Sequence, residues 1–199
     1  PNTEIYYDLE YDEQPGNPGR GPMSEDEDRY IEFWNLVFME FYMNPDGTSQ
    51  PLAMQNVDTG SGLERVAVVL QGVNSIYDTD LFQPIIARGS EIVGVPYGER
   101  EQVDNALRII ADHGRGVTFL IADGVLPSNE GRGYVLRRIL RRAVQKARAI
   151  GVERPFLGDI ADVVIEHFGD QYPELHRRRN VIMDTLRHEE EAFGRTLAT

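Results

Sequence analysis

The sequence predicts an α+β protein in which antiparallel strands are followed by an all-α region. Two runs rich in aromatic and β-branched residues flank a turn early in the chain, as in a β-hairpin. From about residue 78 onward, apolar residues recur at the three- and four-residue spacing of helices. The chain has 199 residues, 41% hydrophobic and 27% charged, which is ordinary for a globular protein of one large domain or two small ones.

The first element is expected at residues 4–9, a strand with the sequence Glu-Ile-Tyr-Tyr-Asp-Leu. A segment rich in Pro and Gly follows at 14–22, and an acidic run stands at 24–28. We interpret both of these segments as solvated loop.

A long buried strand is expected at 30–42, where nearly every position is apolar, and a second strand is expected at 52–58. The Asn-Pro-Asp-Gly turn at 44–47 and the aromatic enrichment favour strand over helix. Side chains alternate between the two faces of a strand. One face of the first strand therefore carries Phe33, Asn35, Val37 and Met39, and one face of the second carries Leu52, Met54, Asn56 and Asp58.

A helix is expected directly after this hairpin, at residues 61–72. Ser61 and Glu64 stand at the spacing of a capping box, and Gly72 suits the end of the helix. The order is therefore strand, sharp glycine turn and helix. The apolar stripe consists of Leu63, Val66, Ala67 and Leu70.

The rest of the chain is expected to be helical, ending in a charged amphipathic helix at 175–197. We place the domain boundary near Gly89, which separates an α+β domain at 1–88 from a helical domain at 89–199. The apolar stripes are Leu81, Ile85 and Ile86; Val103, Leu107 and Ile110; Val117, Leu120 and Ile121; Val135, Leu136, Ile139, Leu140 and Val144; and Ile160, Val163, Val164 and Phe168.

The formal net charge of −13 argues against nucleic-acid binding when it is taken alone, but the charges are unevenly distributed. Acidic residues gather at 24–28 and 189–191, whereas basic residues gather between Arg132 and Arg148. Lys146 is the only lysine. Nearly all the basic residues are therefore arginine. Arginine binds phosphate through two parallel hydrogen bonds, which would explain this preference for arginine over lysine, although genomic base composition explains it equally well.

Several classes of site are excluded or not expected. The absence of cysteine excludes disulfides and thiolate metal sites, and the four histidines lack the HExxH spacing, so no protein zinc site is expected. No apolar run approaches the ~20 residues that span a bilayer, so no membrane partner is expected. The chain starts at Pro1 rather than Met, which suggests a piece of a longer protein.

The segment Val-Asp-Thr-Gly-Ser-Gly-Leu-Glu-Arg at 57–65 carries the first candidate site. Its glycines allow the backbone to approach a ligand closely, and the following helix N-terminus favours anionic groups. Arg65, a cation in the first helical turn, suggests a phosphate ligand, and Asp58, if partly buried, needs a cation or several donors. The alternative is an ordinary turn, with Asp58 as its cap and Arg65 solvated.

This segment resembles the third motif of class II aminoacyl-tRNA synthetases in its alanyl-tRNA synthetase form. The resemblance continues through 34–39, 73–75, 77–82 and 110–113. It is most specific at 124–138, Gly-Val-Leu-Pro-Ser-Asn-Glu-Gly-Arg-Gly-Tyr-Val-Leu-Arg-Arg. Departures from the family pattern are Gly114 and Gly116, where that family usually has bulkier residues, and Asn2-Thr3-Glu4 in place of Cys-Ser-Glu.

The resemblance implies an alanine site and an ATP site. Asp58 would hold the ammonium of L-alanine, and Arg65 would pack on ATP and meet its γ-phosphate; these two are the catalytic candidates. Glu4 would help to coordinate the Mg²⁺ on ATP. The pocket for alanine would be completed by Asn35, Val37 and Gly60, and the ATP site by Gly62.

The second candidate site is basic. Arginines on the faces left by the apolar stripe of 131–148 predict contact with a phosphate backbone, and the alternative is a solvated face paired with the acidic segments. Asn129 resembles the family residue that reads the G·U pair of the tRNA(Ala) acceptor stem, through base edges in the shallow minor groove of A-form RNA. The tRNA-binding candidates are Asn129, Arg132, Arg137, Arg138, Arg141 and Arg142.

The resemblance therefore implies part of a cytoplasmic, ATP-dependent ligase that activates L-alanine and transfers it to tRNA(Ala). The family's first two motifs would precede Pro1, so we expect the chain alone to be inactive. The alternative is an RNA-binding module that retains the synthetase shape without catalysis. Asp58 and Arg65 together favour the enzyme, because a decayed module has no reason to retain both.

Overall fold

The computed structural model describes residues 1–10 and 29–197, which form two compact units, Pro1–Thr79 and Asp80–Thr199. The predicted loop at 14–22 and the acidic run at 24–28 lie outside the described residues. Gly89, where the sequence suggested a boundary, lies inside helix α2 of the second unit.

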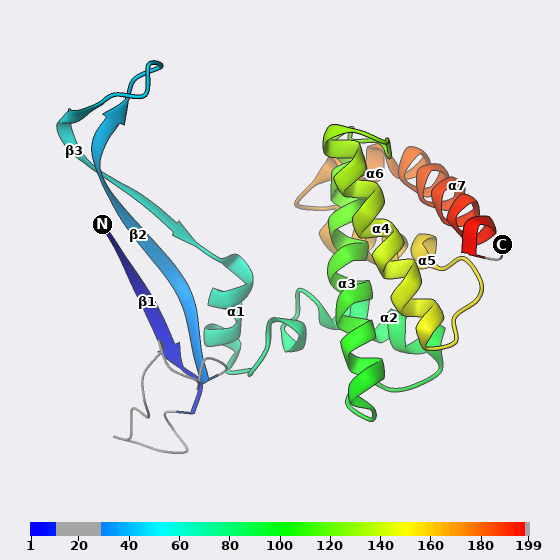
Figure 1. The fold of residues 1–199 in the computed structure, drawn as a ribbon. Helices are drawn as coiled ribbons and strands as arrows, with labels where there is room; N and C mark the ends of the chain where they lie inside the picture. Colours follow the sequence, from blue (N-terminus) through cyan, green and yellow to red (C-terminus); the bar gives the residue numbers. More distant parts are fainter. Residues whose placement is uncertain (11–28, 198–199) are drawn as a thin grey trace. The chain divides into compact units, whose positions relative to one another are not determined.

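The first unit is built on a three-stranded antiparallel sheet in the order β1-β2-β3 (Figure 1). Its strands are β1 (Asn2–Asp8), β2 (Tyr30–Met43) and β3 (Ser49–Ser61). All three predicted strands are confirmed, and β3 is longer at both ends than expected. Bulges interrupt the pairing at Ile5/Tyr6 and Met39/Phe41.

The prediction that 30–42 is buried is wrong for much of β2. Phe41 is 61% exposed and Met43 is 74% exposed, because no second layer covers this end of the hairpin among the described residues of the unit. The strand is nevertheless the centre of the sheet, since β1 and β3 pair with its two edges. Apolar composition therefore identified a central strand but not its burial.

Helix α1 (Leu63–Gln71) follows β3 through the glycine turn, and the short helix η2 (Ile76–Asp78) comes next. The predicted end at Gly72 is confirmed, with the left-handed φ of 63° that glycine adopts without strain. The predicted capping box is wrong, because the N-cap is Gly62 and makes no side-chain cap. The hydroxyl of Ser61 instead donates to the carbonyl of Phe33 at 2.7 Å, which ties the turn to β2.

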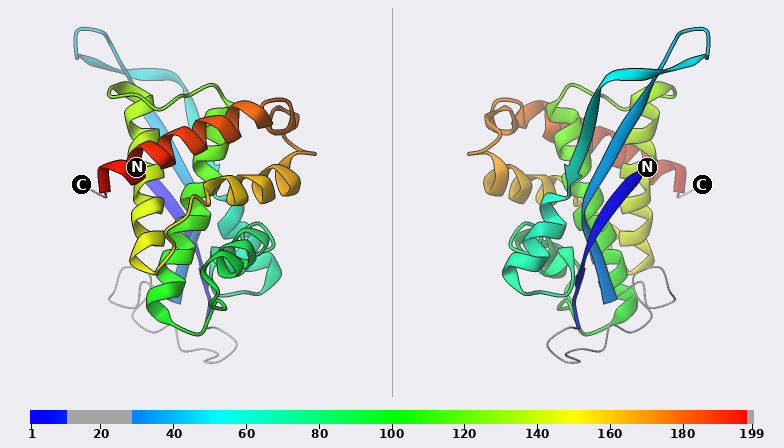
Figure 2. Two further views of the ribbon diagram at one scale, coloured as in Figure 1. Left: turned by 90° about the vertical axis from the view of Figure 1, so that its right-hand side faces the viewer. Right: turned by 90° about the vertical axis from the view of Figure 1, so that its left-hand side faces the viewer.

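In the second unit every described secondary-structure element is a helix (Figure 2), which confirms the prediction of an all-α region. Helices α3 and α4 lie side by side, and α7 packs against α3, α4 and α5 (Figure 1). The expected single helix at 175–197 is divided at Arg178. The helices are α2 (Gln83–Val93), α3 (Glu101–Ala122), α4 (Gly131–Ala149), α5 (Leu157–Phe168), α6 (Pro173–Arg177) and α7 (Arg179–Leu197).

The predicted stripes supply part of the core of this unit, and two of those stripes belong to one helix, α3. Val135 departs from its stripe and is 52% exposed, because α4 turns Leu136 and Leu140 inward instead. Gly114 allows α3 to approach α5, since a Cβ there would lie 2.5 Å from Cγ2 of Ile160. The largest fully buried side chains are Phe82, Ile85, Ile86, Leu107, Ile110, Ile121, Leu136, Leu140, Leu157, Ile160, Leu175 and Ile182.

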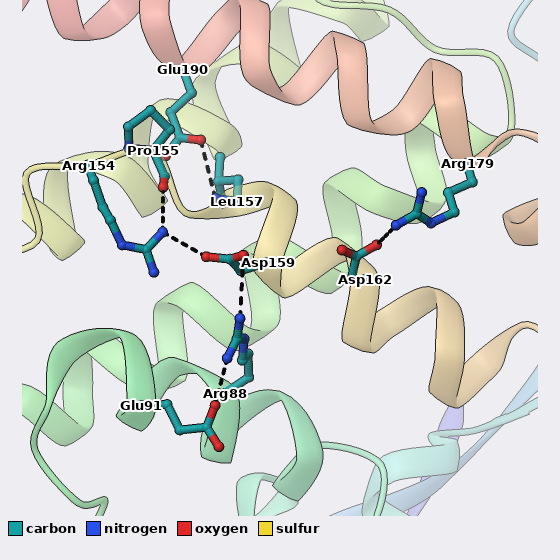
Figure 3. A network of polar contacts seen from close by, with 9 residues as sticks. All are labelled: Arg88, Glu91, Arg154, Pro155, Leu157, Asp159, Asp162, Arg179 and Glu190. Carbon is teal, nitrogen blue, oxygen red and sulfur yellow. Dashed lines mark hydrogen bonds and ion pairs between the residues drawn. The ribbon is translucent and has the colours of Figure 1, made fainter.

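Polar contacts join three of these helices around Asp159 and Glu190 (Figure 3). Asp159 of α5 accepts a hydrogen bond from Arg154 at 2.8 Å and pairs with Arg88 of α2 at 3.4 Å. Glu190 of α7 accepts from the backbone N–H groups of Phe156 and Leu157, at 2.9 and 3.2 Å. This carboxylate therefore caps the N-terminus of α5 from another helix.

Candidate functional site

Two neighbouring rows of residues cross the sheet of the first unit. Glu4 of β1 lies opposite Asn35 of β2, which lies opposite Gly60 of β3. Directly opposed residues share a face, and so do residues two apart along a strand. The next row, Asn2, Val37 and Asp58, therefore lies on the same face. The pairing brings together every residue predicted for the alanine pocket.

Glu4 is the centre of a hydrogen-bond cluster on this face. Its Oε1 accepts from the side-chain amides of Asn2 at 3.0 Å and Asn35 at 3.1 Å. Its Oε2 accepts from the hydroxyl of Tyr6 at 2.6 Å. That hydrogen bond, with desolvation and the negative charge of Glu4, raises the pKa of Tyr6 to about 12. Tyr6 is therefore a fixed donor at physiological pH.

Asp58 is exposed, so the condition of partial burial on which its need for a partner rested is not met. Its carboxylate has no hydrogen-bond or ion-pair partner among residues 1–10 and 29–197. Space is open over the neighbouring Gly60, where an added Cβ would meet nothing within 4 Å. The carboxylate is consequently available to a cationic group that approaches this face.

Arg65 reaches from α1 to the end of the same sheet. Its Nη1 donates to the carbonyl oxygen of Glu32 at 2.7 Å and lies 3.8 Å from the Glu32 carboxylate. Arg65 is thus not the unpaired cation that its helical position suggested, because β2 supplies a partner. Half of its side chain, 51%, remains exposed, so part of its guanidinium can still meet an anionic ligand.

The second candidate site lies on α4. Asn129 is in the loop before this helix, and its Oδ1 accepts a hydrogen bond from Arg137. Arg137 and Arg141 both contact Glu189 of α7, whereas Arg138 and Arg142 are exposed. Four arginines of this helix surround an open hollow whose complete lining is Tyr134, Arg137, Arg138, Arg141, Arg142, Gln145 and Phe193.

The loop that carries Asn129 is tightly packed against the start of α4. A side chain at Gly133 would overlap the carbonyl oxygen of Leu126 and the hydroxyl of Ser128. Arg132, the first arginine of the helix, is exposed. The glycine-rich helix start thus has a packing reason, because it lets the loop lie directly on the helix.

The described part of the chain limits other kinds of site. Among these residues no three His, Cys, Asp or Glu side chains gather as a metal-binding group. None of the described helices is long and apolar enough to cross a membrane.

The model of the family described as tRNA synthetases class II (A) matches residues 1–199. The chain belongs to this family. It is 51% identical over 199 residues to the alanine–tRNA ligase of Halalkalibacterium halodurans, a match that covers 99% of the chain and 22% of that protein. The alanine–tRNA ligases of Geobacillus kaustophilus and Bacillus subtilis are 52% and 51% identical over the same length. The chain spans less than a quarter of these class II synthetases, 22% and 23% of their lengths.

Sequence reasoning on this synthetase chain missed two residues whose importance depends on particular side-chain contacts, Tyr6 and Glu189. Tyr6 carried no signal of its own, because its role depends on the hydrogen bond to Glu4. Glu189 was counted only as part of an acidic run, because its partner Arg141 lies 48 positions away in the sequence. Its helical spacing from buried Ile182, Leu186 and Phe193 marks the inward face of α7 and offered the one available hint.

Proposed function

We propose that this chain forms part of an alanine–tRNA ligase. The first unit, which takes the place of the predicted domain 1–88, contributes to the alanine and ATP sites, and the helical unit, which takes the place of the predicted domain 89–199, contacts the tRNA acceptor stem. The observation that carries the proposal is the register of the sheet. It brings Glu4, Asn35 and Gly60 into one row and Val37 and Asp58 into the next. The high identity to alanine–tRNA ligases along almost the whole chain supports it.

For alanine, the exposed carboxylate of Asp58 supplies the charge that an ammonium group needs. A hydrogen bond between charged groups contributes roughly 1.5–3 kcal/mol. The absence of a side chain at Gly60 leaves room beside it, and Val37 presents an apolar side chain in the same row as Asp58. Asn35 is held by Glu4, which fixes its amide across the strands.

For ATP, Arg65 is the cation placed to meet phosphate, from the start of α1 beside the turn residue Gly62. A guanidinium has five N–H donors, and the one bonded to Glu32 fixes the group while others stay available. Glu4 can serve as one Mg²⁺ ligand, because Mg²⁺ in such sites takes one or two carboxylates together with substrate phosphates. The chemistry proposed is attack of the alanine carboxylate on the α-phosphate of ATP, for which these residues position the reactants and balance their charge.

For tRNA, the exposed side chains of Arg132, Arg138 and Arg142 provide positive charge along α4, and Asn129 lies in the loop before that helix. Arginines on one helix face suit contact with an RNA backbone, and an amide suits base edges in a shallow minor groove. Arg137 and Arg141 are partly neutralised by Glu189, which agrees with the alternative that some of this face pairs with acidic segments.

The test is a chimaera in which this chain replaces the matching segment of the Bacillus subtilis alanine–tRNA ligase. We expect Asp58→Asn to raise the KM for alanine about ten- to a hundred-fold and to leave the KM for ATP nearly unchanged, because the ammonium loses a charged acceptor. Alanine-dependent ATP–pyrophosphate exchange measures both constants. Asp46→Asn is the matched control, since Asp46 lies at the far tip of the hairpin and bonds to Thr48.

Unchanged alanine affinity in Asp58→Asn would remove Asp58 from the alanine site. An unsubstituted chimaera that forms no alanyl-adenylate, but binds tRNA, would instead favour the RNA-binding module without catalysis.

A further inference from the structure

Four arginines in the middle of α4 form two pairs with different surroundings. Arg138 and Arg142 are exposed, and neither has an ion-pair partner among the described residues. The side chains of Arg137 and Arg141 are only 23% and 36% exposed and both face Glu189. A single helix therefore presents one pair of arginines to solvent and turns the other pair toward the protein.

Glu189 brings a carboxylate of α7 into the space between these two arginines. Its side chain is 9% exposed, and an unpaired charge at such a position would be costly. Its Oε1 accepts from Nε and Nη2 of Arg141 at 3.0 and 2.8 Å. The same oxygen lies 3.0 Å from Nε of Arg137 as an ion pair, although that N–H is not directed at it as a hydrogen bond. One oxygen thus contacts both guanidinium groups, through hydrogen bonds from Arg141 and through an ion pair with Arg137.

Arg137, which contacts Glu189, also contacts Asn129. Its Nη1 donates to Oδ1 of Asn129, eight residues earlier in the chain. A guanidinium has donors only, so the atom of the amide that faces it must be the oxygen. The Nδ2 group of the exposed Asn129, with its two N–H donors, is consequently left for a ligand.

We propose that Glu189 is a positioning residue for RNA recognition, which acts through Arg137 to fix the amide of Asn129 with its N–H donors outward. Asn129 then selects a hydrogen-bond acceptor on a base edge, and Arg138 and Arg142 contact the phosphates. This inference rests on the proposed contact between the helical unit and an acceptor stem. The packing of Leu126 and Ser128 against Gly133 supports it, because it holds the loop that carries Asn129 against the start of α4.

The first experiment needs no RNA. In ¹⁵N NMR spectra of the full chain, we expect a slowly exchanging Nε–H signal from Arg141 and well-separated N–H signals from the Asn129 amide. Glu189→Gln removes the negative charge and leaves a weaker, neutral acceptor, so it should reduce the protection and shift the amide signals toward those of a free side chain. Glu191→Gln, at an exposed position of the same helix, should change neither. An unprotected Arg141 in the unsubstituted chain, or no effect of Glu189→Gln, would overturn the inference.

The second experiment measures dissociation constants for two acceptor-stem hairpins that differ only in a G·U or G–C pair, over a range of salt concentrations. Glu189→Gln and Asn129→Asp should both bring the ratio of the two constants toward one. Asn129→Asp keeps the acceptor for Arg137 but removes the outward donors. Replacing Arg138 and Arg142 by Gln should weaken both complexes equally and lower the salt slope by roughly 0.7–0.9 for each phosphate that is no longer neutralised.

The outcomes separate the two claims. Binding without any preference, or no salt-dependent binding, by the unsubstituted chain would contradict the proposed RNA function, while the NMR spectra would still decide whether Glu189 fixes the amide. A preference that survives Glu189→Gln would contradict the positioning role alone. A preference that survives Asn129→Asp would show that the outward donors do not read the base pair.

Discussion

At the scale of single residues, Glu190 shows how a buried carboxylate can have a structural purpose and a cost. It is 5% exposed, and burial raises its pKa to about 7, against the opposing effect of hydrogen bonds from the N–H groups of Phe156 and Leu157. Figure 3 shows the contact with Leu157. The charge of Asp159 raises the pKa further and that of Arg154 lowers it. Its neighbour Glu189 is similarly buried but lies between two arginines, so adjacent residues of one acidic run meet opposite environments.

This pKa predicts a pH dependence of folding. The group titrates near 4.5 when unfolded and near 7 when folded, so the native state binds more protons between these values. Stability should therefore fall as pH rises from about 4.5 to 7, by up to ~1.4 kcal/mol for each pH unit from this group. Chemical denaturation at several pH values measures how the free energy of unfolding of the wild type and of Glu190→Gln changes with pH. The contribution of this group to that change should disappear in Glu190→Gln, whereas Glu191→Gln should keep the pH dependence of the wild type. If Glu190→Gln showed the same pH dependence as Glu191→Gln, the prediction would be contradicted.

Local pattern was enough for some residues and not for others. Alternation along one strand was sufficient to place Asn35 and Val37 on a common face, because that relation needs only two neighbouring positions. The contact between Glu4 and Asn35 could not be predicted in this way, since strand pairing brings together residues 31 positions apart. The exposure of Asp58 could not be predicted either, because an apolar strand does not show which layer will cover it.

At the scale of elements, α3 contains a close approach that its sequence did not reveal. Gly114 and Gly116 stand two positions apart in the same helix. A Cβ at Gly114 would overlap Ile160 of α5, whereas one at Gly116 would meet nothing within 4 Å. Helical periodicity predicted the helix correctly, but only packing distinguishes the two glycines.

The two glycines form a matched pair of substitutions. Gly116→Ala should stabilise the protein by about 0.5–1 kcal/mol, because alanine has the higher helix propensity. Gly114→Ala gains the same propensity but forces Ile160 or the two helices to move, and overpacking costs typically about 1–3 kcal/mol. Denaturant midpoints of the two variants should therefore move in opposite directions. A stabilised Gly114→Ala would mean that α3 and α5 do not approach as closely as described.

At the scale of the whole chain, the two units differ in how much apolar surface they bury. The buried apolar residues of the second unit come from all its long helices, whereas Val68 is the one buried apolar side chain among the described residues of the first unit. The sequence pattern predicted two regions of different class, α+β and all-α. It did not predict this contrast in burial, because the 30–42 strand is as apolar as any core segment.

The contrast predicts two levels of stability within one chain. Native-state hydrogen exchange, measured by mass spectrometry, should find strong protection in α3, α4 and α5 and weak protection in β2 and β3, because regions with few buried side chains open at low free energy. Leu140→Ala should remove much of the helical protection, since deleting a buried leucine side chain costs roughly 2–5 kcal/mol. The amides of the sheet should exchange as before, with Leu70→Ala as a control at a 79% exposed position of α1. If Leu140→Ala accelerated exchange equally in the sheet and in the helices, the two units would unfold together, and the stability of the first would depend on the core of the second.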